Sequence, residues 1–209
     1  MRKFLALLAL LVCSGLFPAP LPAQDHILIF GGYSYLRPPV TSTQAFFCTA
    51  QVCPLLPIAP FNVTSTRNLN GFELSATYRF LPFLGIAADF SGHYGSTLNH
   101  SPSSVHQYTG LVGPEVALPS RVSPFAHVLF GGTHQTVTAG AVTPVANEGY
   151  YGVVPNTVHS FATAIGAGID LKIVPHVWLR PIQIDYLLTR LHSSTQNQPR
   201  ISAGLVLHF

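Results

Sequence analysis

The stretch "ISAGLVLHF", from Ile201 to Phe209, alternates bulky apolar residues with small or polar ones. One parity holds Ile201, Leu205, Leu207 and Phe209, and the other holds Ser202, Gly204, Val206 and His208. Because successive side chains of a strand point to opposite faces, the pattern predicts a strand with one apolar face and one small or polar face. A soluble domain more often closes with a frayed, polar segment. The composition of the chain indicates which kind of sheet this strand belongs to.

Charged residues make up 8% of the chain, whereas an ordinary soluble domain has about 25%. The mean hydropathy is positive, at +0.38. Beyond the first residues, however, no stretch is as long as the roughly 18 apolar residues that a membrane-spanning helix needs. A transmembrane β-barrel satisfies both observations, because its strands alternate between an apolar outer face and a polar lumen.

The first 23 residues have the pattern of a cleaved signal peptide. Arg2 and Lys3 precede an apolar run from Phe4 to about Val12, and a small-residue cleavage site ends at Ala23. We therefore expect a mature chain of residues 24–209 that forms a single domain. Within it Cys48 and Cys53 predict a local disulfide, as is usual for a close pair in an exported protein. The rival interpretation, half of a structural zinc site, has no second cysteine pair to complete it.

Eight segments are predicted to be strands, joined alternately by short and long connections. They are residues 26–36, 69–80, 83–95, 105–118, 122–137, 158–172, 177–190 and 200–209. The long connections, residues 37–68, 96–104, 138–157 and 191–199, are rich in Pro, Ser, Thr, Asn and Gly. This layout predicts an eight-stranded antiparallel up-and-down barrel with short periplasmic turns, long extracellular loops and both termini on the periplasmic side.

Charges within the strands share the parity of the small residues, which predicts a charged lumen. The predicted network consists of Glu73, Arg79, Asp89, Glu115, Asp170, Arg180 and Asp185. A soluble barrel with an apolar interior would show the reverse polarity.

Arg180 does not share the parity of Gln183 and Asp185 on the same strand. Pro181 lies between them and cannot donate to a ladder, so we predict a β-bulge there that turns Arg180 into the lumen. Without a bulge, Arg180 would face the headgroups near the periplasmic rim, which its long side chain tolerates.

Four stretches together resemble the OmpA-like and OmpX-like family of small bacterial outer-membrane barrels, over essentially the whole mature chain. They are "FGGYSYLR" (Phe30–Arg37), "GAGIDLKI" (Gly166–Ile173), "RPIQIDYLLTR" (Arg180–Arg190) and the closing "GLVLHF". The resemblance implies an integral protein of the bacterial outer membrane. It also implies that the barrel-assembly machinery reads the last strand with its terminal Phe209. Members of this family serve as anchors, adhesins, narrow porin-like channels and, rarely, enzymes.

Three functions stay open on the sequence. The first is a structural or surface-interaction role, with four extracellular loops displayed on a rigid barrel and a ligand bound by them. The second is a narrow, weakly cation-preferring channel for ions or small polar solutes, because acids outnumber bases in the predicted lumen. The third, remote, is a lipid-modifying enzyme. Besides the bilayer and the assembly machinery we expect no nucleic-acid partner and no cofactor, and we expect a monomer.

Aromatic side chains near the strand ends predict the interfacial belts of a membrane barrel. These are Tyr33, Tyr35, Tyr78, Tyr94, Trp178 and Tyr186. In the first long connection, Phe46 and Phe47 beside the cysteines suggest an apolar recognition tip; the alternative is a loop folded over the barrel mouth.

Six histidines map to outer strand ends or loops: His93, His100, His106, His134, His159 and His192. None forms a His-x-His pair, so solvated histidines are expected there rather than a metal site. The neighbours His159–Ser160 and His192–Ser193 would point to opposite faces, so we predict no catalytic residues.

Overall fold

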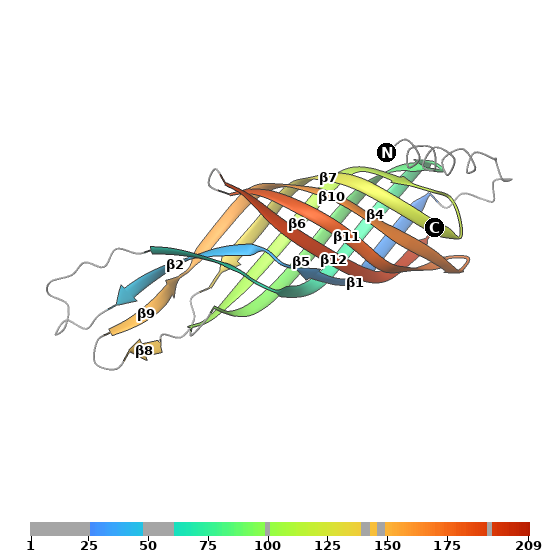
Figure 1. The fold of residues 1–209 in the computed structure, drawn as a ribbon. Coiled ribbons are helices and arrows are strands. Elements are labelled where there is room, and N and C mark those ends of the chain that lie inside the picture. The colour runs from blue at the N-terminus through green and yellow to red at the C-terminus, as the bar shows by residue number, and fades with distance from the viewer. Residues whose placement is uncertain (1–25, 48–60, 99–100, 139–142, 146–148, 192–193) are drawn as a thin grey trace, which may run out of the picture.

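The computed structural model describes residues 26–47, 61–98, 101–138, 143–145, 149–191 and 194–209, and they form strands and turns (Figure 1). The predicted signal peptide and the predicted Cys48–Cys53 disulfide lie outside these residues. Eight strands close into an antiparallel barrel in the order β1-β12-β11-β10-β7-β6-β5-β4. Their bounds are β1 (Ile27–Leu36), β4 (Leu69–Leu81), β5 (Leu84–Leu98), β6 (Ser101–Ala117), β7 (Val122–Val137), β10 (Asn156–Val174), β11 (Val177–Leu191) and β12 (Ser194–His208). The predicted eight-stranded barrel is confirmed. No helix in the described part of the chain is long and apolar enough to cross a membrane.

Alternation along each strand sorts its side chains between the interior and the outer wall. In β4, Glu73 and Thr77 are buried, whereas Leu74 and Tyr78 are about half exposed. A shift of one residue in register would exchange the two faces, so the alternation also fixes how each strand pairs with its neighbours.

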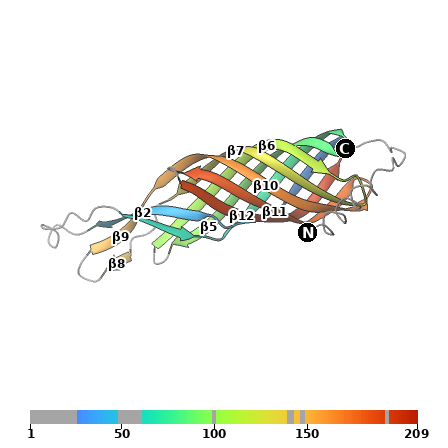
Figure 2. The same cartoon turned by 45° about the horizontal axis from the view of Figure 1, so that its top comes forward.

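Two of the predicted long connections contain a second sheet. Its strands are β2 (Pro39–Phe47), β3 (Phe61–Thr66), β8 (Thr143–Val145) and β9 (Gly149–Val154), in the order β3-β2-β9-β8. The sheet extends beyond the end of the barrel that lies opposite the C-terminus (Figures 1 and 2). The described parts of residues 37–68 and 138–157 are therefore mainly strand. β2, β3 and β9 are each separated from a barrel strand by only one or two residues, and they pair with one another beyond the rim.

The other two predicted long connections, residues 96–104 and 191–199, are mostly strand. β5 and β6 stay paired as far as Leu98 and Ser101, and β11 and β12 as far as Leu191 and Ser194. Their Ser, Thr, Asn and Gln residues resemble a loop in composition, but a main-chain ladder accommodates polar side chains on exposed strand ends.

The predicted bulge at Pro181 is confirmed, since the pairing of β11 slips by one residue against both neighbours there. Arg180 pairs with Gly204 and Gln183 with Ser202, so three steps along β11 match two along β12. The extra residue turns Arg180 into the interior, where it is 3% exposed.

The same bulge also turns Trp178 inward. Its ring packs against the buried residues Leu28, Phe30 and Val206 and stacks on His208, with the ring centroids 4.4 Å apart. The prediction that Trp178 belongs to an outer aromatic belt was therefore wrong. The bulge was predicted to turn Arg180 inward, and the same change of parity applies to Trp178, two residues earlier on β11.

We predict that deleting Pro181 destabilises the barrel, because Arg180 would return to the outer wall and leave Asp170 buried without its cation. Uncompensated buried charges cost about 3–5 kcal/mol of unfolding free energy. Urea unfolding in lipid vesicles measures this cost. Pro181→Ala keeps the residue count, hence the bulge, and should stay within about 1 kcal/mol of the parent. Equal stability of the deletion and the substitution would contradict this account of the bulge.

Candidate functional site

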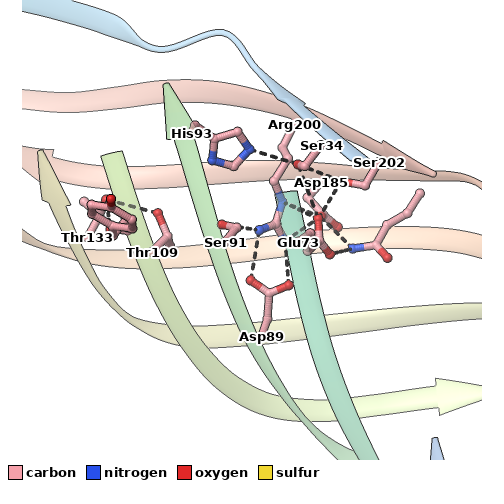
Figure 3. A network of polar contacts seen from close by, with 12 residues as sticks. Ser34, Glu73, Asp89, Ser91, His93, Thr109, Thr133, Asp185, Arg200 and Ser202 are labelled. Carbon is pink, nitrogen blue, oxygen red and sulfur yellow. Dashed lines mark hydrogen bonds and ion pairs between the residues drawn. The ribbon is translucent and has the colours of Figure 1, made fainter. Parts of the chain in front are cut away.

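A single guanidinium, that of Arg200 on β12, lies at the centre of the barrel interior among three carboxylates (Figure 3). Its Nη1 donates to Oδ1 of Asp89 over 2.9 Å, and its Nε donates to Oδ2 of Asp185 over 2.8 Å. The Nε also lies 3.4 Å from Oε2 of Glu73. Arg200 is fully buried, and each of the three acids is at most 5% exposed. One residue of the last strand therefore holds together side chains from β4, β5 and β11.

Neutral donors complete the hydrogen bonding of these carboxylates. Gln183 donates to Oε1 of Glu73 over 2.7 Å and to Oδ2 of Asp185 over 2.8 Å. Ser202 donates to Oε2 of Glu73, and Nε2 of His127 lies 2.9 Å from Oδ1 of Asp185. Together with the two bonds from Arg200 to Asp89, every carboxylate oxygen of the cluster has a donor. Burial of these charges is tolerated because they are fully bonded.

Two further ion pairs lie nearer the C-terminal end of the barrel. Arg180 forms a two-pronged pair with Asp170, with Nε–Oδ1 and Nη2–Oδ2 distances of 2.7 and 2.9 Å. Its guanidinium also lies 4.0 Å from the ring centroid of Phe125. Nη2 of Arg79 lies 3.7 Å from Oε1 of Glu115. The structure thus buries all seven residues of the predicted lumen network, and each of the five acids contacts an arginine.

Arg200, the centre of the network, was not among the predicted lumen residues. The predicted strand began at Arg200, which placed that residue at a strand end, whereas β12 begins at Ser194. The signal was present in the opening stretch, because Arg200 shares the parity of Ser202, Gly204 and His208. Glutamines were missed as well: Gln107 donates to Gln198 over 2.7 Å nearer the projecting sheet.

Buried apolar clusters adjoin the polar network. At the end with the second sheet, the buried cluster comprises Leu36, Val40, Leu69, Val105 and Val137. At the C-terminal end, Leu28, Phe30 and Val206 pack with Trp178. A third cluster, which includes Leu111, Leu129 and Leu187, lies on β6, β7 and β11. Polar and apolar side chains thus share the interior, as expected when eight strands enclose just enough space for side chains.

Four of the predicted belt aromatics lie on the outer wall. Tyr33, Tyr78, Tyr94 and Tyr186 are 38–55% exposed. Tyr35 is half-buried, and its hydroxyl donates to the side chain of Asn68 over 2.8 Å.

The predicted rim histidines divide between the two faces. His93 is fully buried inside the barrel, with Nε2 2.9 Å from Oγ of Ser34, so its assignment to the rim was wrong. His106, His134 and His159 lie on the outer wall, and His100 and His192 lie outside the described residues. His134 and His159, which are far apart in sequence, face each other.

His159 and Ser160 point to opposite faces of β10, as the alternation predicts. His159 is exposed on the outer wall, and Ser160 has the opposite parity. Among the described residues no group of three or more His, Cys, Asp or Glu side chains could hold a metal ion. The buried network itself offers hydrogen-bonded charge pairs and no exposed nucleophile.

We predict that Arg200→Met lowers the unfolding free energy by about 3–5 kcal/mol, because three carboxylates would lose their only shared cation. Urea unfolding in vesicles checks this value. Arg190→Met, at an exposed position of β11, should change stability by less than about 0.5 kcal/mol. Adding Glu73→Gln, Asp89→Asn and Asp185→Asn to the Arg200 variant should recover most of the loss. If the combined variant is as unstable as Arg200→Met alone, charge burial is not the cause.

No protein-family model and no curated protein sequence matches the chain. Solved structures match it in fold. The attachment invasion locus protein Ail of Yersinia pestis superposes with a TM-score of 0.52 at 16% identity, covering 88% of this chain and 99% of Ail. Neisserial surface protein A superposes with a TM-score of 0.56 at 11% identity, covering 88% of this chain and 97% of its own. The outer membrane protein OprG of Pseudomonas aeruginosa superposes with a TM-score of 0.52 at 12% identity, covering 89% of this chain and 96% of its own. The chain has the fold of the small bacterial outer-membrane β-barrel proteins.

Proposed function

We propose that this protein is an integral outer-membrane barrel whose role is structural and surface-interacting: a sealed barrel anchors a sheet that projects from the cell. The observation that carries the proposal is the combination of a filled interior with the four-stranded sheet beyond the rim. An interior packed in this way provides rigidity, and the projecting sheet provides the surface available to a partner.

The outer wall supports insertion into a bilayer. Large apolar side chains cover it, including Phe161, Ile184 and Leu205, which are 52–59% exposed. Water would solvate these side chains poorly, whereas lipid tails match them, and closure of the barrel leaves no strand edge within the hydrocarbon. Two structural neighbours, neisserial surface protein A and the outer membrane protein OprG, are a surface protein and an outer-membrane protein by name.

Export and assembly follow from the same proposal. Residues 1–23 would act as the cleaved signal, and the short turns with the C-terminus would face the periplasm. Phe209 and Ile27 exchange two main-chain hydrogen bonds of 2.9 and 3.1 Å at the seam where β12 meets β1. A terminal strand that closes the barrel is a suitable signal for the assembly machinery, because it must be in place before the seam can form.

The projecting sheet has the features of a recognition surface. Within the described residues, β3 pairs only with β2 and β8 pairs only with β9, so each is an edge strand. An edge strand presents unpaired N–H and C=O groups to which an extended segment of another protein can add. The name of the Yersinia protein, attachment invasion locus, agrees with such a role on this fold.

The channel hypothesis receives less support. The acids that suggested cation preference are each held by an arginine, and buried apolar side chains pack toward both ends of the described interior. A hydrated ion would have to break buried ion pairs to pass.

We predict that the protein, once inserted in a planar bilayer, produces no discrete current steps, because its interior is filled. Insertion is verified beforehand by the faster gel migration of unheated protein. Cation-preferring steps that disappear in Asp89→Asn would overturn the sealed interior and restore the channel.

We also predict that the sheet can be removed without loss of the barrel. Leu36 pairs with Leu69, and Val137 pairs with Asn156, so an Asn-Gly turn can replace residues 37–68 and another can replace residues 138–155. The doubly shortened protein should keep its heat-dependent migration, even though Val40 is lost from the interior cluster.

Bacteria producing this shortened protein should adhere several-fold less to a basement-membrane matrix gel or settle more slowly from suspension than those producing the parent. A matched control changes only His100, which lies between β5 and β6 in the sequence, to Gly, so that an Asn-Gly pair is introduced there without removal of the sheet. The proposal fails if the shortened barrel is folded and both adhesion and settling equal those of the parent.

A further inference from the structure

His134 on β7 and His159 on β10 lie directly opposite each other on the outer wall of the barrel. Their Nδ1 atoms are 3.2 Å apart, their ring centroids are 4.4 Å apart, and the ring planes are inclined at 53°. No local sequence pattern indicates this pair, because 25 residues separate the two histidines and the interval contains β8 and β9.

The separation of the two nitrogens matches that of two imidazoles bound to one zinc ion. Zn–N bonds of about 2.0–2.1 Å at a tetrahedral angle place the two nitrogens about 3.3–3.4 Å apart. We propose that His134 and His159 form a two-histidine site for Zn²⁺ on the outer wall, with water or an external ligand in the remaining positions. The distance between the two Nδ1 atoms has to change by only about 0.1–0.2 Å, and the rings have to turn so that both lone pairs point at the ion.

A neighbouring hydroxyl prepares one of the two ligands. Nε2 of His134 lies 3.2 Å from Oγ1 of Thr136, two residues along the same strand. When Nε2–H donates to this oxygen, the proton is on Nε2 and the lone pair of Nδ1 points toward His159. Metal-binding histidines in proteins generally have such a second hydrogen bond, which fixes tautomer and ring orientation.

Zinc would replace the N–H···N hydrogen bond between the rings. In the metal-free pair, His159 donates from Nδ1–H to Nδ1 of His134. On binding, both Nδ1 atoms ligate the ion, and the proton of His159 moves to its Nε2 through solvent. Both imidazoles stay neutral, so no net proton is released.

The surroundings leave room for the other ligands. An open groove of about 580 Å³ adjoins the pair and is lined in part by Tyr108, Gly132 and Phe161. His159 is exposed, so water and ions reach it directly. Since the described residues supply no group of three ligands, binding should be exchangeable and weaker than at a structural four-ligand site.

The position of the site gives it a consequence for the molecule. His134 lies three residues before the end of β7, and His159 three residues after the start of β10, at the rim from which β8 and β9 extend. An ion shared between them would fix these two strands at the base of the projecting sheet. This consequence, though not the site itself, depends on the proposed role of that sheet.

The test is a Zn²⁺ titration of the folded, membrane-extracted protein by calorimetry. We compare His134→Gln and His159→Gln with His106→Gln, a histidine on the same wall whose ring contacts Tyr94 and whose Nε2 bonds Ser104. We expect each substitution in the pair to weaken the tightest zinc binding at least tenfold and His106→Gln to leave it unchanged. Excess Mg²⁺, which prefers oxygen ligands, should not displace the zinc.

A second measurement does not depend on variants that fold. In protein with ¹⁵N-labelled histidine, zinc should shift the Nδ1 resonances of two histidines together, at one equivalent of metal. The site is refuted if the parent binds no zinc beyond the level of the double variant, if His106→Gln is equally impaired, or if no histidine Nδ1 resonance shifts. Binding by the parent that survives in both single variants would also refute it. None of these outcomes bears on whether the barrel is sealed or adheres.

Discussion

The closed barrel depends on one buried contact, that of the Arg200 guanidinium with the carboxylates of Glu73, Asp89 and Asp185. These acids lie on β4, β5 and β11, while Arg200 lies on β12, which completes the ring by pairing with β1. Before β12 is in register, three carboxylates have no cation. Afterwards, each carboxylate oxygen has a donor. Since uncompensated buried charge is costly, electrostatics selects the same register that the hydrogen-bond ladder and the alternation of apolar residues select.

The interior and the outer wall of the barrel carry different kinds of side chain. The described interior is packed with paired charges and buried apolar clusters. The outer wall carries apolar side chains and, near the rim, a pair of histidines. In the proposed function, the groups available to a partner are those of the rim and the projecting sheet. Substitutions there need not disturb the network around Arg200, so surface recognition can change while the barrel stays intact.

The alternation of residues in the sequence was sufficient to predict the barrel but not the residue at the centre of its interior network. Alternation located all eight strands, and the parity of Arg180 relative to Gln183, with Pro181 between them, predicted a bulge that the pairing confirms. Trp178 was misplaced because that bulge changes the parity of every residue before it on the strand. Arg200 was missed because one end of a polar strand resembles a loop in composition. The contact between His134 and His159 depends on which strands pair, and no local pattern encodes that.

Continuity between barrel and sheet makes the sheet a defined surface rather than a set of loops. β1 leads into β2 after two residues, β3 leads into β4 after two, and β9 leads into β10 after one. Val40 of β2 is fully buried in the same cluster as Leu36 and Leu69, so the base of the sheet packs on the barrel interior. Binding to a preorganised strand edge loses less conformational entropy than binding to a flexible loop of equal length. In the proposed role a partner would therefore need fewer contacts for a given affinity, and the rigid, ion-paired interior would support the sheet to which that partner binds.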